Sequence, residues 1–166
     1  TQGKFGGAAS YKADSGISSG PGWGAAAGYN EMTIAAWIKP TSDGSGYVVS
    51  SSGSGDANGC CWRWILNRQW NNKILFALWD GDGSYIYSNA AVPTNQWTHV
   101  AATLRVGEKN RLYINGVLQN ESSDIKSNGA WGHLHVGSIK WNGSAQYTFP
   151  GYIDDVAIWT YQMADS

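Results

Sequence analysis

Charged side chains are scarce in this 166-residue chain, at 14% of all residues, and the net charge is −1. Nucleic acids and anionic membranes are bound through clusters of lysine and arginine, which this composition does not supply. The sequence also lacks any apolar run near the 18 residues that suggest a membrane-spanning helix. The composition therefore argues against a nucleic-acid partner and against membrane insertion.

Cysteine is nearly absent, and its two copies are neighbours, Cys60 and Cys61. Adjacent residues of a strand point to opposite faces, which favours one thiol facing inward and the other outward. A disulfide between them would close a strained ring, but the turn-like segment SGSGDANG before them leaves that alternative open. The cysteine count alone does not fix the compartment.

Glutamate is also rare, with only Glu31, Glu108 and Glu121 in the chain. Glycoside hydrolysis needs two carboxylates about 5–10 Å apart across the bond that breaks. None of the three glutamates lies inside a predicted strand, and no two share one. Asp80 and Asp82 share a face by spacing, but they lie in a turn where solvent keeps both ionised. We therefore predict that this chain is not an enzyme.

The same two aspartates belong to the segment DGDG at 80–83, which superficially suggests an EF-hand loop. Such a loop needs an acidic residue at its twelfth position, and that position is Ala91. Asp-Gly pairs between two strand-like segments are typical of a hairpin turn. We predict a hairpin that joins 73–79 to 84–89.

Glycine and aromatic residues with a polar edge are abundant: the chain has 22 Gly, 10 Trp and 9 Tyr, against only 3 Phe. Ten tryptophans exceed what the core of a domain of this size needs. Tyrosine and tryptophan are favoured where an apolar surface must stay in contact with water. Low charge with many Gly, Ser and Asn residues fits a secreted or cell-surface protein.

Short segments rich in β-branched and aromatic residues recur about every ten residues, separated by turn-forming sequences. No segment has a convincing amphipathic helical pattern. This spacing predicts an all-β sandwich or barrel, in a single domain over 1–166. The expected strands are 32–40, 46–52, 61–67, 73–79, 84–89, 97–105, 111–117, 133–139 and 152–159.

Six of the motifs stand in a recognisable order along nearly the whole chain. They are GKFGGAASY (3–11), MTIAAWIKP (32–40), NQWTHVAATL (95–104), RLYINGVL (111–118), LHVGS (134–138) and GYIDDVAIW (151–159). The series resembles the laminin-G-like, concanavalin A-like lectin/glucanase domains. The resemblance implies a jelly-roll β-sandwich of two curved antiparallel sheets. It also implies that Trp37, Trp97 and Trp159 are core or sheet-edge residues.

Three classes of function accompany this resemblance. Many such domains are carbohydrate-binding modules or lectin-like domains attached to secreted enzymes, and we predict this class, with neighbouring domains in a longer protein. Others are extracellular adhesion or protein-interaction domains, which remain the alternative. Some relatives are glycosidases or polysaccharide lyases, but the missing pair of acids argues against that class.

Tryptophans in or beside turns are the candidate sugar platforms. Sugar rings present an apolar face of C–H groups and a rim of hydroxyls, so they need an aromatic surface with polar side chains beside it. A core cannot absorb four turn tryptophans, and we predict that at least two of Trp70, Trp79, Trp131 and Trp141 stack on a polysaccharide. The predicted hydroxyl partners are Arg63, Arg68, Asp80 and Asn142.

The strand at 61–67 helps to divide these residues between core and surface. By alternation, Trp64 shares a face with Leu66, while Arg63 shares the opposite face with Ile65. We predict that Trp64 is buried and that the face of Arg63 is open. Trp62 begins the strand beside the cysteines, and we expect it at the rim of the binding surface.

Two neighbouring aspartates, Asp154 and Asp155, interrupt the last predicted strand. Alternation places Asp154 on the same face as Val156 and Ile158. An ionised carboxylate on an apolar face costs several kcal/mol or more unless it has a partner. The candidate partners are a cation, a basic side chain or a set of backbone N–H groups, and the basic residues nearest in sequence, Lys126 and Lys140, are not obviously inward.

The resemblance implies a structural Ca²⁺ in this region, bound by an aspartate of the final strand and carbonyls of the first. Calcium takes six to eight oxygen ligands, which suits a carboxylate with nearby carbonyls. Asp154 is the main candidate ligand, assisted by Asp155, with further ligands near 3–7 or at Asp14. The sequence departs from the family pattern at Lys12. The alternative, that Asp154 accepts N–H bonds from the N-terminal segment, stays open.

Overall fold

The computed structural model describes residues 3–7, 9–11, 17–18, 30–53, 62–78, 84–122, 131–141 and 144–163. Within these ranges strands alternate with turns, and the same residues contain no helix long and apolar enough to cross a bilayer. The strands are β1 (Ala9–Tyr11), β2 (Ile17–Ser18), β3 (Glu31–Pro40), β4 (Gly46–Gly53), β5 (Trp62–Arg68), β6 (Lys73–Leu78), β7 (Ser84–Ala91), β8 (Thr98–Arg105), β9 (Arg111–Ile114), β10 (Val117–Glu121), β11 (Trp131–Val136), β12 (Ile139–Trp141), β13 (Ser144–Gln146) and β14 (Gly151–Trp159).

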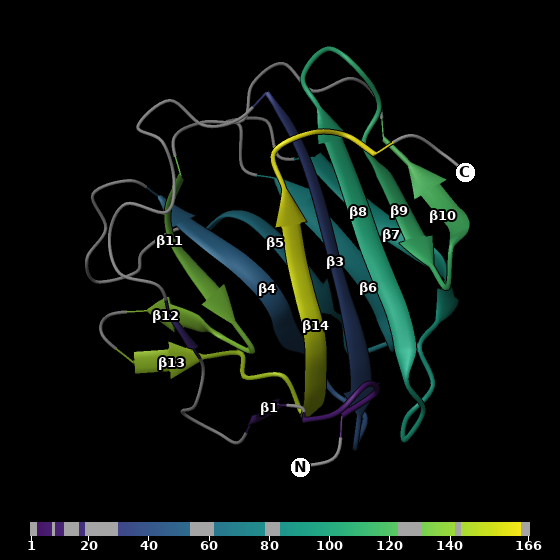
Figure 1. Ribbon diagram of the computed structural model, residues 1–166, viewed down its shortest axis with the longest axis vertical. Coiled ribbons are helices and arrows are strands. Elements are labelled where there is room, and N and C mark those ends of the chain that lie inside the picture. The colour runs from purple at the N-terminus through teal and green to yellow at the C-terminus, as the bar shows by residue number, and fades with distance from the viewer. Residues whose placement is uncertain are drawn as a thin grey trace.

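The strands form two layers, which are visible as two stacked sheets in Figure 1. Sheet I has the order β1-β14-β3-β8-β9-β10, and sheet II has the order β2-β11-β4-β5-β6-β7. Strands β12 and β13 form a separate hairpin. Neighbouring strands are antiparallel in both sheets, and sequence-distant strands such as β3 and β14 lie side by side. The predicted jelly-roll β-sandwich is confirmed.

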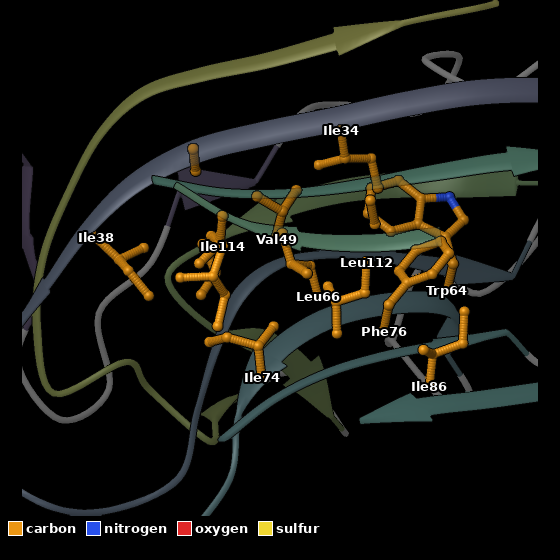
Figure 2. Close-up of a cluster of buried hydrophobic side chains, with 14 of the residues drawn as sticks. Ile34, Ile38, Val49, Trp64, Leu66, Ile74, Phe76, Ile86, Leu112 and Ile114 are labelled. Carbon is orange, nitrogen blue, oxygen red and sulfur yellow. The ribbon is translucent and has the colours of Figure 1, made fainter. Parts of the chain in front are cut away.

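The core lies between the two sheets, because every second side chain of each central strand points inward. Ile34 and Ile38 of β3 are fully buried and face Trp64, Leu66 and other side chains of sheet II. Figure 2 shows this layer, with Phe76 and Ile74 of β6 packed in the same cluster. The predicted burial of Trp64 is confirmed, with none of its surface exposed.

Part of the outer face of sheet II is also covered, contrary to the prediction for strand 61–67. Ile65 is only 3% exposed and belongs to a second, smaller cluster with Tyr47, Leu75 and Ala77. Ile139 of the β12–β13 hairpin completes that cluster. The face opposite Trp64 is therefore not open at Ile65, because a hairpin that the sequence pattern did not reveal packs over it.

Glycine-containing turns divide two of the predicted strands. The segment 111–117 is two strands, β9 and β10, joined by Asn115 and Gly116 with φ values of 50° and 77°. Positive φ at both central residues is the type I′ hairpin pattern that Asn-Gly favours. The segment 133–139 is divided at Gly137, which has φ 79°, into the end of β11 and the start of β12, which belong to different sheets.

The hairpin predicted around DGDG is confirmed by its strands. β6 and β7 are antiparallel neighbours, and Leu78 at the end of β6 pairs with Ser84 at the start of β7. The loop at 79–83 itself lies outside the described residues.

Candidate functional site

Trp70 occupies the turn between β5 and β6, and 77% of it is exposed. The turn is held by two backbone hydrogen bonds: Asn72 N–H donates to the carbonyl of Gln69 at 2.9 Å, and Gln69 N–H donates to that of Lys73 at 2.8 Å. Asn72 takes the left-handed conformation that this tight turn needs, with φ 63°. The indole is therefore displayed to solvent by a closed, hydrogen-bonded turn.

The turn that contains Gly44 lies against the indole of Trp70. A Cβ atom added at Gly44 would be 3.8 Å from Cζ3 of Trp70 and 3.9 Å from Cγ of Pro150. Gly44 has φ 140°, a conformation that residues with side chains rarely adopt. The glycine thus lets the backbone turn beside the aromatic ring, with the proline close by.

Tyr147 is a second exposed aromatic residue, on the same connection as Pro150. It is 60% exposed, and its ring centroid lies 5.4 Å from that of Tyr47. The two residues are also joined by a backbone hydrogen bond of 2.9 Å from Tyr47 N–H to the carbonyl of Tyr147. Burial, with a further contribution from Tyr147, raises the pKa of Tyr47 to about 12. The sequence did not indicate Tyr147, because its pattern does not reveal the short β13 strand that precedes this residue.

Asp43 provides negative charge beside Trp70, one residue before Gly44. Its side chain is 77% exposed, and Oδ1 accepts a 2.8 Å hydrogen bond from Nδ2 of Asn72. That bond ties the 41–44 turn to the turn that carries Trp70. The carboxylate is thereby held in place beside the aromatic surface.

Arg68, a predicted hydroxyl partner, is fully buried and does not reach the surface. It ends β5 on the core-facing side, where Nη1 donates to the carbonyls of Ser42 and Gly44 at 2.9 and 3.0 Å. Nη2 lies 3.6 Å from Oδ1 of Asp43. Burial lowers the pKa of Arg68, and Asp43 opposes that shift. The guanidinium shapes the 42–44 turn instead of meeting a ligand, because the residue shares the inward face of Trp64 and Leu66.

The other predicted platform residues lie at the edges of the described structure. Trp62 and Arg63 begin β5, Trp131 begins β11 and Trp141 ends β12. These positions are strand ends, and the contribution of these side chains to a binding surface stays a prediction. Trp79, Asp80, Asn142 and the pair Cys60–Cys61 lie outside the described residues.

Asp154 is hydrogen-bonded to the N-terminal segment. Its Oδ2 accepts from the backbone N–H of Lys4 at 2.7 Å and, more weakly, from that of Phe5 at 3.5 Å. Its Oδ1 accepts from the N–H of Asp155 at 3.0 Å. Gly3 packs directly against the carboxylate, and a Cβ atom there would collide with Oδ2. Several N–H donors around one carboxylate stabilise its charge.

The predicted face of Asp154 is wrong, because a β-bulge interrupts β14. Pairing with β3 shifts between Asp154 and Ala157, and Asp155 takes the left-handed conformation with φ 47°. A bulge inserts an extra residue and reverses the alternation beyond it. Val156 and Ile158 therefore pack on the core, whereas Asp154 pairs with Trp37 on the outer face of sheet I.

The surroundings of Asp154 fit a hydrogen-bonded carboxylate better than a calcium ligand. Calcium needs six to eight oxygen ligands. Three backbone N–H groups, which repel a cation, donate to Asp154, and the described oxygen beside Gly3 and this carboxylate is the carbonyl of Gly7. Within the described residues, no group of three His, Cys, Asp or Glu side chains is placed to hold a metal ion. Asp155 is exposed at the bulge, and Asp14 lies outside the described residues. The calcium site stays a prediction that these contacts do not favour.

Aromatic rings and a lysine gather around Trp37 on the outer face of sheet I. Phe5 meets Trp37 edge to face with centroids 6.0 Å apart, and the His99 ring lies 5.3 Å from Trp37. Nζ of Lys4 lies 4.7 Å from the centroid of the Trp37 ring, within cation–π range. The resemblance had implied that Trp37 is a core or sheet-edge residue. It lies instead on the outer face of a central strand. Burial lowers the pKa of His99.

Each of the three glutamates forms ion pairs with basic side chains. Glu31 and Glu108 both lie 3.3 Å from Arg105. Glu121 pairs with Lys109 and lies 3.6 Å from Arg111. A hydrogen bond from Lys109 lowers the pKa of Glu121. Their places on different strands and turns do not form the paired acids of a glycosidase.

Solved structures with the same fold include several domains of carbohydrate-active proteins. Domain 4 of the arabinanase AbnA from Geobacillus stearothermophilus, in complex with arabinotriose, is 23% identical, with a TM-score of 0.72 over 99% of this chain and 76% of that chain. The CBM40 domain of the Ruminococcus gnavus IT-sialidase, bound to α2,3-sialyllactose, is 19% identical, with a TM-score of 0.71 over 96% of both chains. These similarities establish the shared fold.

A sequence relative is the botulinum-like toxin eBoNT/J from an Enterococcus species, which is 38% identical over 58 residues. That match covers 35% of this chain and only 4% of the toxin. A broader match covers most of the chain. Residues 13–166 match the family described as the concanavalin A-like lectin/glucanases superfamily, and the protein belongs to that superfamily.

Proposed function

We propose that this domain binds glycans without catalysing a reaction and that Trp70 is a principal contact. The exposure of Trp70 on a closed turn carries the proposal. An indole that is 77% exposed offers its apolar face to a ligand, and the turn around it is already ordered. Little further ordering is then needed when a sugar ring stacks on it.

Polar groups surround this aromatic surface. Asp43 and Asn71 are exposed beside Trp70, and Tyr147 adds a second ring at this end of the sandwich. Carboxylate and amide groups suit the hydroxyl rim of a sugar, and aromatic faces suit its C–H face. The two structural relatives in complex with arabinotriose and sialyllactose support a sugar as the ligand class.

A non-catalytic role is supported by the acids that the structure describes. The three glutamates are engaged with Arg105, Lys109 and Arg111 on the surface. Asp154 is occupied by backbone N–H groups. The binding surface is proposed to extend over the further residues predicted from the sequence: Trp62, Arg63, Trp79, Asp80, Trp131, Trp141 and Asn142. The protein itself is proposed to be secreted or displayed at the cell surface.

Substitution of Trp70 tests the proposal directly. Trp70→Ala should weaken binding to the preferred glycan about five- to thirtyfold, since one stacking interaction contributes about 1–2 kcal/mol. Affinity of the parent domain for a single chain should lie between micromolar and millimolar. A glycan array should find the ligand, and titration calorimetry should measure both proteins.

Tyr161→Ala is the matched control. Tyr161 is 51% exposed, and only its backbone carbonyl accepts the hydrogen bond from Thr33. This variant should bind as the parent does. Retention of no glycan by the parent, or equal binding by Trp70→Ala, would rule the proposal out. Capture of one defined extracellular protein with no glycan retained would instead identify an adhesion domain.

A further inference from the structure

The charges beside Trp70 are separated between the inside and the outside of the protein. Arg68 and Asp43 form an ion pair of 3.6 Å, but the side chain of Arg68 is 0% exposed, whereas that of Asp43 is 77% exposed. The positive member is already hydrogen-bonded to the carbonyls of Ser42 and Gly44. A ligand that approaches Trp70 therefore meets the carboxylate and not the guanidinium.

The carboxylate is fixed close to the aromatic surface. Asn72 donates to Asp43, so that the two turns are joined, and Gly44 next to Asp43 is so near the indole that an added Cβ atom would be 3.8 Å from Cζ3 of Trp70. A carboxylate held in one place cannot turn away from a like charge on a bound ligand, so the distance between the two charges, and with it their repulsion, is fixed. The position is thus part of the recognition surface.

The remaining polar groups of this turn are uncharged or less exposed. Asn71 is exposed, and its Oδ1 accepts the backbone N–H of Lys73 at 3.1 Å. Lys73, a cation close to Trp70 in sequence, is half-buried at the start of β6. Ile74 next to it is buried in the core, so the Lys73 side chain leaves β6 on the opposite face from the inward-pointing Arg68.

We infer that the Trp70 surface selects neutral glycans and disfavours glycans that carry carboxylate or sulfate groups, and this inference rests on the proposed function. Asp43 provides the selection, because a like charge next to the bound sugar is repelled. Amides and the indole itself make no such distinction. Repulsion between exposed charges is modest in water, so the preference should be roughly three- to tenfold at low ionic strength. Salt should reduce it, because exposed charges are screened.

The test compares the whole 166-residue protein on matched polysaccharides by affinity electrophoresis. Fully methyl-esterified polygalacturonate is paired with polygalacturonate, and unsubstituted xylan with glucuronoxylan. The parent protein should be retarded more strongly by the neutral member of a pair. Asp43→Asn, whose new amide oxygen still accepts the hydrogen bond from Asn72, should narrow that preference to within about twofold by improving retention on the acidic polymer.

Glu108→Gln is the control for net charge. It removes the same charge from the exposed turn after β8, next to Arg105. Arg105 pairs in register with Glu31 at the start of β3, whereas the 41–44 turn follows Pro40 at the other end of that strand. It should leave the preference as in the parent. A parent that prefers the acidic polymers overturns the inference, and so does an Asp43→Asn variant with an unchanged preference. Two other outcomes, no retention of any glycan by the parent and equal binding by Trp70→Ala, would contradict the proposed function itself. They can be told apart from a failure of the inference, which changes only the preference between neutral and acidic polymers.

Discussion

Single residues on the outer face of sheet I connect protonation to stability. The ring of His99 lies tilted against that of Trp37, at an interplanar angle of 60°, and burial lowers the pKa of its imidazole. Lys4 lies over the ring of Trp37, and Asp154 of the neighbouring strand β14 pairs in register with Trp37. The native surroundings of His99 therefore favour the neutral ring over the imidazolium.

This environment predicts how stability changes with pH. The folded-state pKa of His99 lies below its unfolded value near 6.5, so the unfolded chain binds the proton more readily. Stability should be greatest above pH 6.5 and should decrease as the pH falls through that value. Urea unfolding of the parent and of His99→Gln between pH 5 and 8 measures the effect. The variant should lose less stability on acidification, and identical pH profiles would contradict this assignment.

At the scale of the strand, the alternation of side chains predicted the main elements well. Each of the nine predicted segments overlaps a strand of the structure, because β-branched and aromatic residues recur where both sheets bury one face. The burial of Trp64 followed from the same rule. These features depend only on residue types that repeat along one strand.

The errors lie where backbone conformation or a distant segment intervenes. The bulge at Asp155 reversed the predicted face of Asp154, and a positive φ cannot be read from an aspartate alone. Ile65 is covered by the β12–β13 hairpin, which is far away in the sequence. Arginine is usually a surface residue, and the burial of Arg68 depends on hydrogen bonds to carbonyls of the 42–44 turn. Of the candidate site, the sequence indicated Trp70 but neither Tyr147 nor Asp43.

The attachment of segment 3–7 to β14 is an element-scale prediction. Asp154→Asn replaces one acceptor oxygen with an amide group that donates, so the N–H groups of Lys4 and Phe5 lose a charged acceptor. We expect a loss of about 1–3 kcal/mol in the free energy of unfolding. Gly3→Ala should also destabilise, because its Cβ atom would collide with the carboxylate. Chemical denaturation of both variants measures these changes.

The same proteins distinguish hydrogen bonding from calcium binding at Asp154. If N–H donors alone stabilise the carboxylate, a chelator should leave the melting temperature of the parent unchanged. A bound ion stabilises the folded state in proportion to its concentration over its Kd, so added Ca²⁺ would then raise the melting temperature. A fall in melting temperature on chelation that Ca²⁺ reverses, and that is absent in Asp154→Asn, would establish the calcium site instead.

At the scale of the whole molecule, one continuous core joins the two sheets. Met32, Ile34 and Leu104 of sheet I belong to the same buried cluster as Phe76 and Ile86 of sheet II. Neither sheet can separate without exposing the inner face of the other. This shared core predicts that both sheets unfold together, in a single cooperative transition, as is usual for domains of about this size.

Two phenylalanines of very different burial test that cooperativity. Phe76 is fully buried between the sheets, whereas Phe5 is 71% exposed and contacts Trp37 edge to face. Phe76→Ala should lower the free energy of unfolding by about 3–5 kcal/mol through lost burial and a cavity. Phe5→Ala should cost about 1 kcal/mol or less, as expected for loss of one exposed aromatic pair.

In urea, circular dichroism and tryptophan fluorescence should give one coincident transition for the parent and both variants. Separate transitions for the two probes in Phe76→Ala would mean that the sheets are stabilised independently, and equal losses in the two variants would contradict the core placement of Phe76.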